Sequence, residues 1–139
     1  MINYVVGLMF NLDKTKVALI RKNRPEWQNG LLNGIGGKNN EGEHSVDAMT
    51  REFEEETSLK TFWYDWWPLV TLTAQNNAWQ VDVFYAMGNW LGLLKDTTDE
   101  KIEIIDVANI DNEKTISNIP WLIRMCFDKQ FVSGQIKCK

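Results

Sequence analysis

The sequence predicts a mixed fold of the α/β or α+β class, in which helices pack on a sheet. Three observations lead to this class. The predicted elements follow the order strand, strand, helix, strand, strand, strand, helix, and both predicted helices are amphipathic. The chain has 139 residues without a linker, repeat or low-complexity segment, so residues 1–139 are expected to form a single domain.

The first half of the chain begins with a predicted hairpin. Residues 4–10 and 16–21 are β-rich runs, and the polar residues 11–15 between them favour a turn. Residues 22–40 contain Pro25 and several glycines, and they predict a long irregular loop, which in a compact domain is usually functional or disordered.

A helix is predicted next, over residues 45–57. Ser45 is expected as its N-cap, and Asp47 suits the first turn, where the helix dipole favours an anion. The helix has an apolar stripe of three residues, Val46, Met49 and Phe53.

Three more strands are predicted after this helix. Residues 66–74 and 80–87 are β-rich, with a turn at Asn76 and Asn77, and residues 101–107 form a further strand. Seven tryptophans are many for this length, and most are expected in the core or at its edges, with one or two available to line a base-binding cleft.

The last predicted element is a helix over residues 118–129, with Asn118 as its N-cap and Pro120 in its first turn. Cys126 is expected to be buried as a small hydrophobic residue, and Cys138 to lie in the tail. The two cysteines suggest no disulfide framework and have no metal-binding spacing.

Composition excludes some function classes. The formal net charge of −4 argues against a general nucleic-acid binder, although a metal ion can supply positive charge for a small anionic substrate. No apolar stretch approaches the roughly 20 residues of a membrane span, and the N-terminus lacks the basic leader of a signal peptide. A cytoplasmic protein without a membrane partner is therefore expected.

A cluster of glutamates in the first helix is the strongest functional signal. Glu52, Glu55 and Glu56 fall within an arc of about 100° on one helix face, beside the apolar stripe. A solvated acidic face would explain such a run, but like charges at these spacings repel, and the helix dipole disfavours anions in the last turns. A divalent cation would compensate for both effects, and Mg²⁺ prefers oxygen ligands. Gly36 and Gly37 allow a backbone to approach a ligand closely, or they simply form a turn.

These residues resemble the signature of the Nudix hydrolase family, G-x5-E-x7-R-E-U-x-E-E-x-G-U, where U is a bulky apolar residue. Eight of its nine specified positions agree over residues 37–59. The exception is Ser58, where the family has a glycine in a position at which left-handed geometry is common. The serine is expected to reduce stability or shift the turn without abolishing activity. The resemblance implies the Nudix α/β/α sandwich with a mixed sheet.

The resemblance also implies the roles of site residues. Mg²⁺, for which Mn²⁺ can substitute, would be held by the carbonyl of Gly37 and by the carboxylates of Glu52, Glu55 and Glu56. Glu100 from a later loop would complete the set. Glu103 is the alternative to Glu100, and Glu100 could also be only an exposed loop acid. The residues expected in catalysis are Glu43, Arg51, Glu52, Glu55 and Glu56. Arg51 would orient the glutamates and Glu43 would brace the loop.

Residues 29–38, just before and at the start of this signature, resemble the corresponding stretch of the MutT-like enzymes that hydrolyse oxidised-purine nucleoside triphosphates. An amide at Asn33 would bind the purine there, unless Asn33 only satisfies the loop backbone. Asn118 would contact the base, or simply cap its helix. The expected substrate-binding residues are Asn33, Gly36, Gly37, Lys38 and Asn118.

The predicted activity is therefore hydrolysis of a (d)NTP, with oxidised purines such as 8-oxo-dGTP as candidates, to a nucleoside monophosphate and pyrophosphate. Other substrates of the form NDP-X (ADP-ribose, a dinucleoside polyphosphate, capped RNA) remain alternatives, although the proline expected in ADP-ribose enzymes is missing around Thr73 to Gln75. A catalytically silent nucleotide-binding domain, or an interaction domain using surface tryptophans, are the non-enzymatic alternatives. His44 is expected to be a solvated loop residue. The chain is expected to be a monomer or a homodimer.

Overall fold

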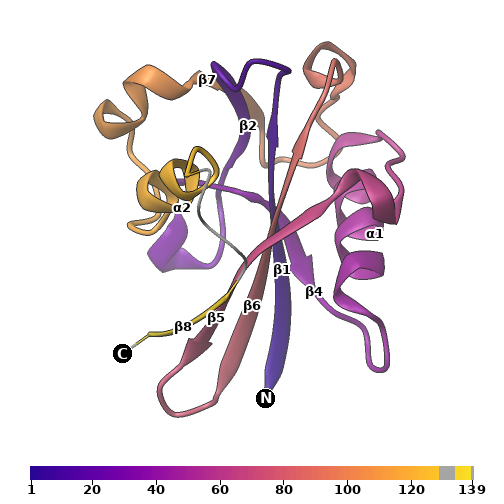
Figure 1. The fold of residues 1–139 in the computed structure, drawn as a ribbon, viewed down its shortest axis with the longest axis vertical. Coiled ribbons are helices and arrows are strands. Elements are labelled where there is room, and N and C mark those ends of the chain that lie inside the picture. The colour runs from indigo at the N-terminus through magenta and orange to yellow at the C-terminus, as the bar shows by residue number, and fades with distance from the viewer. Residues whose placement is uncertain (129–133, 139) are drawn as a thin grey trace.

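The fold is a mixed sheet with a helix on each side (Figure 1). The structure is a computed structural model that describes residues 1–128 and 134–138. Its two α-helices are α1 (Ser45–Thr57) and α2 (Ile119–Met125). Its strands are β1 (Ile2–Phe10), β2 (Lys16–Arg21), β3 (Leu32–Asn33), β4 (Ile35–Lys38), β5 (Trp67–Ala74), β6 (Trp79–Met87), β7 (Ile102–Asp106) and β8 (Gly134–Cys138). The described residues also form the 3₁₀ helices η1 (Glu26–Gln28), η2 (Trp63–Asp65), η3 (Leu91–Leu93) and η4 (Val107–Asn112).

Strand β1 organises the sheet, whose path runs β3-β2-β1-β6-β5-β8. The pairs β1–β6 and β5–β8 are parallel, and the other pairs are antiparallel. Along its length β1 changes partner, because residues 4–7 pair with β4 and residues 9–10 pair with β2. This change brings β4, and with it the glycines before α1, to the middle of the sheet.

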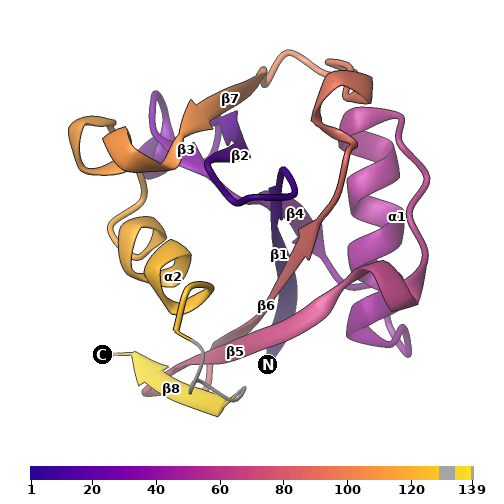
Figure 2. The same ribbon diagram turned by 45° about the horizontal axis from the view of Figure 1, so that its top comes forward.

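The two faces of the sheet carry separate cores, because successive side chains of a strand point to opposite faces. Leu8 and Phe10 of β1 belong to the core beneath α2, and Val5 and Met9 belong to the core beneath α1. Figure 2 shows the sheet between α1 and α2. The mixed sheet with helices packed on both faces, expected from the sequence, is confirmed.

Helix α1 has the predicted bounds, but its start differs in detail. The N-cap is the exposed His44, whose side chain makes no capping hydrogen bond, so the prediction of Ser45 as N-cap is wrong. The Ser45 hydroxyl instead donates to the Asp82 carboxylate on β6, which ties the helix start to the sheet. Met49 and Phe53 of the predicted stripe are buried, and Val46 packs against the same core.

The prediction of one irregular loop over residues 22–40 is wrong in part, because the segment contains β3 and β4. The sequence of β4 is Ile-Gly-Gly-Lys, and glycine has little strand propensity. A Cβ at Gly36 would lie 1.9 Å from the carbonyl oxygen of Val5. The glycine is therefore required by close packing of β4 against β1, which local sequence rules do not reveal.

The C-terminal region also departs from the prediction. Helix α2 ends at Met125, earlier than residue 129, which lies outside the described residues. Pro120 lies in its first turn as predicted. Cys138 belongs to β8, an unpredicted strand that pairs with β5, whereas Cys126 is buried as expected, and both cysteines are free.

The tryptophans are less buried than predicted. Trp66 is buried against Phe53 of α1. Trp27, Trp63 and Trp67 are instead exposed, at 68%, 66% and 58% of their surface. Within the described ranges, no helix has the length and apolar character needed to cross a bilayer.

Candidate active site

Arg51 is the centre of the acidic face of α1. Its Nε and Nη2 donate to both carboxylate oxygens of Glu43, at 2.9 and 3.0 Å, and its Nη1 donates to Glu52 at 2.9 Å and to Glu55 at 3.3 Å. Nη2 also donates to the carbonyl of Lys38 at 3.0 Å. The hydrogen bond from Arg51 lowers the pKa of Glu43, and the same contact raises the pKa of Arg51. One planar guanidinium thus joins the loop before the helix to two of its glutamates.

Glu52 lies directly over Gly37. A Cβ built at Gly37 would come within 2.4 Å of the carboxyl carbon of Glu52 and within 2.6 Å of both its oxygens. Any residue larger than glycine at position 37 would displace this carboxylate. The spacing of Gly37 and Glu52 in the motif therefore corresponds to a close contact between strand β4 and helix α1.

Glu56 is the glutamate of this face that Arg51 does not hold. Its Oε2 is buried and has no hydrogen-bond partner. Burial raises the pKa of Glu56, and the charges of Glu100, Glu52 and Glu55 raise it further, while Lys22 opposes the rise. An unpartnered buried carboxylate oxygen costs free energy unless a cation or proton satisfies it.

Glu100 approaches this group from the loop before β7, and it is only 4% exposed. Its Oε1 accepts from Lys22 Nζ at 2.9 Å, and its Oε2 accepts from the N–H groups of Asn23 and Arg24 at 2.6 and 3.2 Å. Burial alone would raise the pKa of Glu100, but these hydrogen bonds outweigh burial and lower it. The reading of Glu100 as an exposed loop acid is therefore wrong.

Glu103, the alternative to Glu100, lies farther along β7 and is engaged elsewhere. Its two carboxylate oxygens accept from Nε and Nη2 of Arg21, at 2.7 and 2.8 Å. The hydrogen bond from Arg21 lowers the pKa of Glu103. Of these two acids, Glu100 is the one whose charge raises the pKa of Glu56, so Glu100 is favoured over Glu103 as the later acid of the site.

The candidate ligand atoms suit a hard divalent cation, although in this structure they lie too far apart to form one coordination shell. Among residues 1–128 and 134–138, no three acidic, histidine or cysteine side chains converge closely enough to form a metal cluster. The carboxylates are held by Arg51 and Lys22 instead. All the candidate ligands are oxygens, which Mg²⁺ prefers. The free Oε2 of Glu56 and the close cradle between Gly37 and Glu52 are features that a cation would satisfy.

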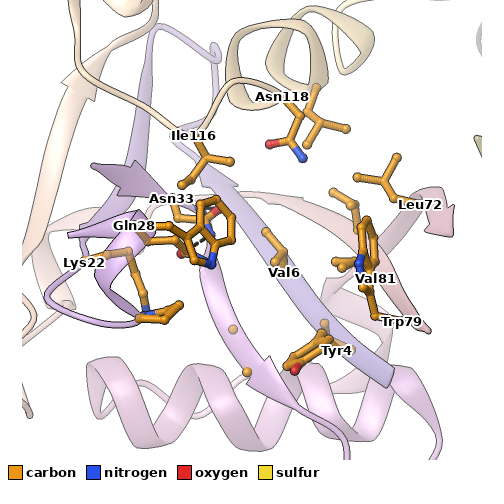
Figure 3. Close-up of a pocket in the computed structure, with 18 residues that line it drawn as sticks. Tyr4, Val6, Lys22, Gln28, Asn33, Leu72, Trp79, Val81, Ile116 and Asn118 are labelled. Atoms are coloured by element: carbon orange, nitrogen blue, oxygen red, sulfur yellow. Dashed lines mark hydrogen bonds between the residues drawn. The ribbon is translucent and has the colours of Figure 1, made fainter. Parts of the chain in front are cut away.

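A cavity of about 470 Å³ opens on the α2 face of the sheet, next to these carboxylates. In Figure 3, Lys22, Gln28 and Asn33 lie at one end, Tyr4, Trp79 and Val81 lie at the other, and Val6 lies between them. Gly36 and Gly37 line the cavity as well. Gly37 therefore borders both the cavity and the carboxylate of Glu52.

Two predicted base contacts, Asn33 and Asn118, line the cavity together. Asn33 Oδ1 accepts from the N–H of Gly34 at 2.8 Å, and its Nδ2 donates to Gln28 at 3.2 Å, so this amide does satisfy its own loop. Asn118 stands at the N-cap position of α2 without a capping hydrogen bond, and its Oδ1 is buried and unpartnered. Its amide points toward the middle of the cavity (Figure 3). The capping role predicted for its side chain is therefore wrong.

Other cavity residues were not foreseen. Lys38 does not line the cavity and contributes its carbonyl to Arg51, whereas Lys22, Trp27 and Trp79 do line it. The sequence predicts one or two tryptophans at a base-binding cleft without identifying them, and Trp27 and Trp79 line this cavity. The only sequence signal for Lys22 was its place at the end of a predicted strand.

Ser58 ends α1 in the left-handed conformation, with φ 63° and ψ 1°, and its N–H donates to the carbonyl of Glu54 at 2.8 Å. The turn is therefore kept as a glycine would form it, and the serine bears the conformational cost. Of the two expected effects of this substitution, a shifted turn is not observed.

Comparisons with known proteins agree with this geometry. The model of the NUDIX domain family matches residues 1–122. No curated protein sequence matches the chain significantly. The fold is similar to a MutT structure from a study of the Aliivibrio salmonicida and Vibrio cholerae proteins, with a TM-score of 0.73, 22% identity and 89% and 95% of the two chains covered.

Two further structures extend the similarity. The mutator MutT protein of Bacillus halodurans has a TM-score of 0.74 and 17% identity over 99% of this chain and 90% of that chain. The NUDIX domain of Shewanella oneidensis NrtR, in complex with ADP ribose, has a TM-score of 0.68 and 16% identity over 90% and 85%. Since the family model covers most of the sequence, this chain belongs to the NUDIX domain family.

Proposed function

We propose that this chain is a magnesium-dependent hydrolase that converts a (d)NTP to a nucleoside monophosphate and pyrophosphate, with oxidised purines such as 8-oxo-dGTP as the first candidates. The observation that carries this proposal is the position of Gly37, which borders the cavity on one side and Glu52 on the other. A nucleotide in the cavity would present its phosphates to the acidic face of α1.

The proposed reaction is attack of water on phosphorus. The water oxygen forms a new bond to phosphorus, one P–O bond of the anhydride breaks, and the proton of the water passes to a carboxylate. Bound Mg²⁺ would neutralise the phosphate oxygens and lower the pKa of the attacking water. Such reactions depend mainly on positioning and charge stabilisation.

Different residues of the chain would bind the cation, orient the carboxylates and accept the proton. Glu52, Glu55, Glu56 and Glu100, with the Gly37 carbonyl, would hold the cation. Arg51 and Glu43 act as positioning residues, since the guanidinium fixes the orientation of Glu52. Glu56 is the first candidate for accepting the proton, because one of its oxygens has no other partner.

The base would bind where Asn33 and Asn118 line the cavity. Asn118 offers an amide whose oxygen is unused, and an amide can both donate to and accept from a purine edge. Asn33 has less remaining capacity to hydrogen-bond a base, because its side-chain amide already makes two hydrogen bonds within its own loop. Trp27 and Trp79 offer aromatic faces for stacking.

A second candidate is binding or hydrolysis of an ADP-ribose-like ligand. The similar NrtR domain was solved with ADP ribose, and a cavity of about 470 Å³ is large enough for more than a single base. A silent domain would have no need of the glutamates of α1, so their retention favours the enzyme.

A product assay tests the proposal. Purified protein with Mg²⁺ would be given unmodified and 8-oxo (d)NTPs, ADP-ribose, a dinucleoside tetraphosphate and capped RNA, and the products would be resolved by ion exchange. Monophosphate and pyrophosphate from triphosphates are expected, with loss of turnover in Glu56→Gln and normal turnover in Glu54→Gln, which alters an exposed neighbour outside the acidic face. Nucleotide binding without turnover of any substrate would instead establish the silent domain.

A further inference from the structure

The environment of Glu100 raises a question that the proposed function leaves open. Both carboxylate oxygens already have partners, since Oε1 accepts from Lys22 Nζ and Oε2 accepts from the N–H groups of Asn23 and Arg24. The side chain is 5% exposed, so it has little access to solvent. These three contacts use three of the roughly four lone-pair sites of a carboxylate. A cation at Glu100 would therefore lie beside the Lys22 ammonium, and the two positive charges would repel each other.

Of the hydrogen bonds that Glu100 accepts, the one from Lys22 can be released most easily, and the Arg24 guanidinium lies farther away, with Nη1 4.0 Å from Oε2. The N–H groups of Asn23 and Arg24 belong to the backbone, and they move only if the chain between β2 and η1 moves. The ammonium of Lys22 is a point charge on a flexible four-carbon stem, and its side chain retains 20% exposure and lines the cavity. It can leave Glu100 by rotation about side-chain bonds alone.

Lys22 also acts on the neighbouring glutamate. Glu56 has a buried, unpartnered Oε2, and the charges near it include the attractive charge of Lys22 and the repulsive charge of Glu100. Lys22 thus offsets the repulsion between two carboxylates that approach each other from α1 and from the loop before β7. A divalent cation placed between them would do the same with twice the charge.

We propose that Lys22 competes with the divalent cation: its ammonium pairs with Glu100, and Glu100 exchanges Lys22 for the metal when a cation binds. This inference rests on the proposed metal site. The exchange reduces the affinity of the site for cations, and it returns the ammonium to the wall of the cavity, where a nucleotide phosphate would be the nearest available anion.

The test is direct binding of Mn²⁺, followed by the paramagnetic signal of free Mn²⁺ or by calorimetry, without any nucleotide. The variant Lys22→Met removes the competing charge and keeps the length of the stem. Its Mn²⁺ affinity is expected to be about 5- to 20-fold higher than that of the wild type, a range that corresponds to the roughly 1–2 kcal/mol of one partly screened charge contact. The matched control is Lys16→Met, which removes a lysine from the exposed pair with Asp106 and should leave the affinity unchanged.

A double-mutant cycle separates exchange at Glu100 from a general effect of charge. If Lys22 competes through Glu100, Lys22→Met increases Mn²⁺ affinity far less in the Glu100→Gln background. Melting curves with chelator and with Mn²⁺ show that each variant folds, and the stabilisation by Mn²⁺ should be larger for Lys22→Met than for the wild type. Equal or weaker binding by a folded Lys22→Met, with binding by the wild type intact, overturns this inference alone. Absence of Mn²⁺ binding in wild type and variant overturns it together with the proposed metal site.

Discussion

The carboxylate of Glu52 lies so close to the α-carbon of Gly37 that an added Cβ would meet its carboxyl carbon at 2.4 Å. The contact joins the strand that borders the cavity to the helix that carries the glutamates. Because only the mobile end of one side chain stands in the way, a substitution at Gly37 should affect the site more than the fold.

Gly37→Ala is expected to lower kcat on the order of 10- to 100-fold, since displacing a catalytic group by about 1 Å has effects of this size. Its stability should fall by about 1 kcal/mol or less. Gly36→Ala is the contrasting variant, because its Cβ would lie 1.9 Å from the backbone oxygen of Val5. It should lose about 3 kcal/mol or more. Denaturant unfolding and steady-state kinetics measure both effects, and equal destabilisation by the two alanines would contradict this account.

Arg51→Lys should disturb the site and the fold together. Lysine keeps the charge but cannot bond Glu43, Glu52 and the Lys38 carbonyl at once, as the guanidinium does. We expect a loss of about 1–3 kcal/mol in the free energy of unfolding, because hydrogen bonds to charged groups are lost. Arg124→Lys is the control, since its pair with Asp111 is exposed on both sides and should change stability by less than about 0.5 kcal/mol.

The raised pKa of Glu56 predicts that the stability of the protein depends on pH. This pKa is raised by burial above the ordinary 4.5, so the folded state binds its proton more tightly than the unfolded state. The folded protein therefore loses stability as pH rises from below 4.5 through the raised pKa. With a chelator present, Glu56→Gln should be more stable than the wild type at neutral pH, and this gain should disappear in acid. Thermal melts between pH 4 and 8 test this expectation, and a gain that persists at low pH argues against it.

The substitution Asn118→Leu is expected to weaken substrate binding without lowering the stability of the fold. Asn118 Oδ1 is buried without a partner, and its side chain makes no capping hydrogen bond, so the substitution should leave stability unchanged or raise it. If Asn118 contacts the base, the variant should lose about 1–3 kcal/mol of substrate binding, which corresponds to a KM roughly 5- to 150-fold higher, with kcat less affected. An unchanged KM across the substrate panel would remove Asn118 from the base site.

Ser58→Gly should stabilise the protein without changing catalysis. The serine has φ 63°, which costs about 1 kcal/mol for a residue with a Cβ. Gly42 provides the reverse experiment, because it has φ 76° and open space around it, so Gly42→Ala should lose a similar amount through backbone strain alone. Unfolding free energies of both variants check the two opposite signs.

The sequence by itself determined what depends on local spacing. The bounds of α1, its buried stripe and its glutamate face follow from the period of a helix, so they could be predicted residue by residue. The turns at 11–15 and around Asn77 were equally local, because asparagine and aspartate side chains bond their own backbone. The resemblance to the family motif added the roles expected of these residues, since the motif too is a pattern of spacing.

The tertiary structure decided everything that depends on separated segments. Strand β4 was missed because its glycines are needed for contact with β1, and β8 because its exposed residues gain their structure by pairing with β5. The ion pair of Lys22 with Glu100 joins residues 78 positions apart, and Trp27, Trp79 and Asn118 reach one cavity from three parts of the chain. Such contacts arise from the packing of strands and loops around one sheet, and no local propensity of the residues records them.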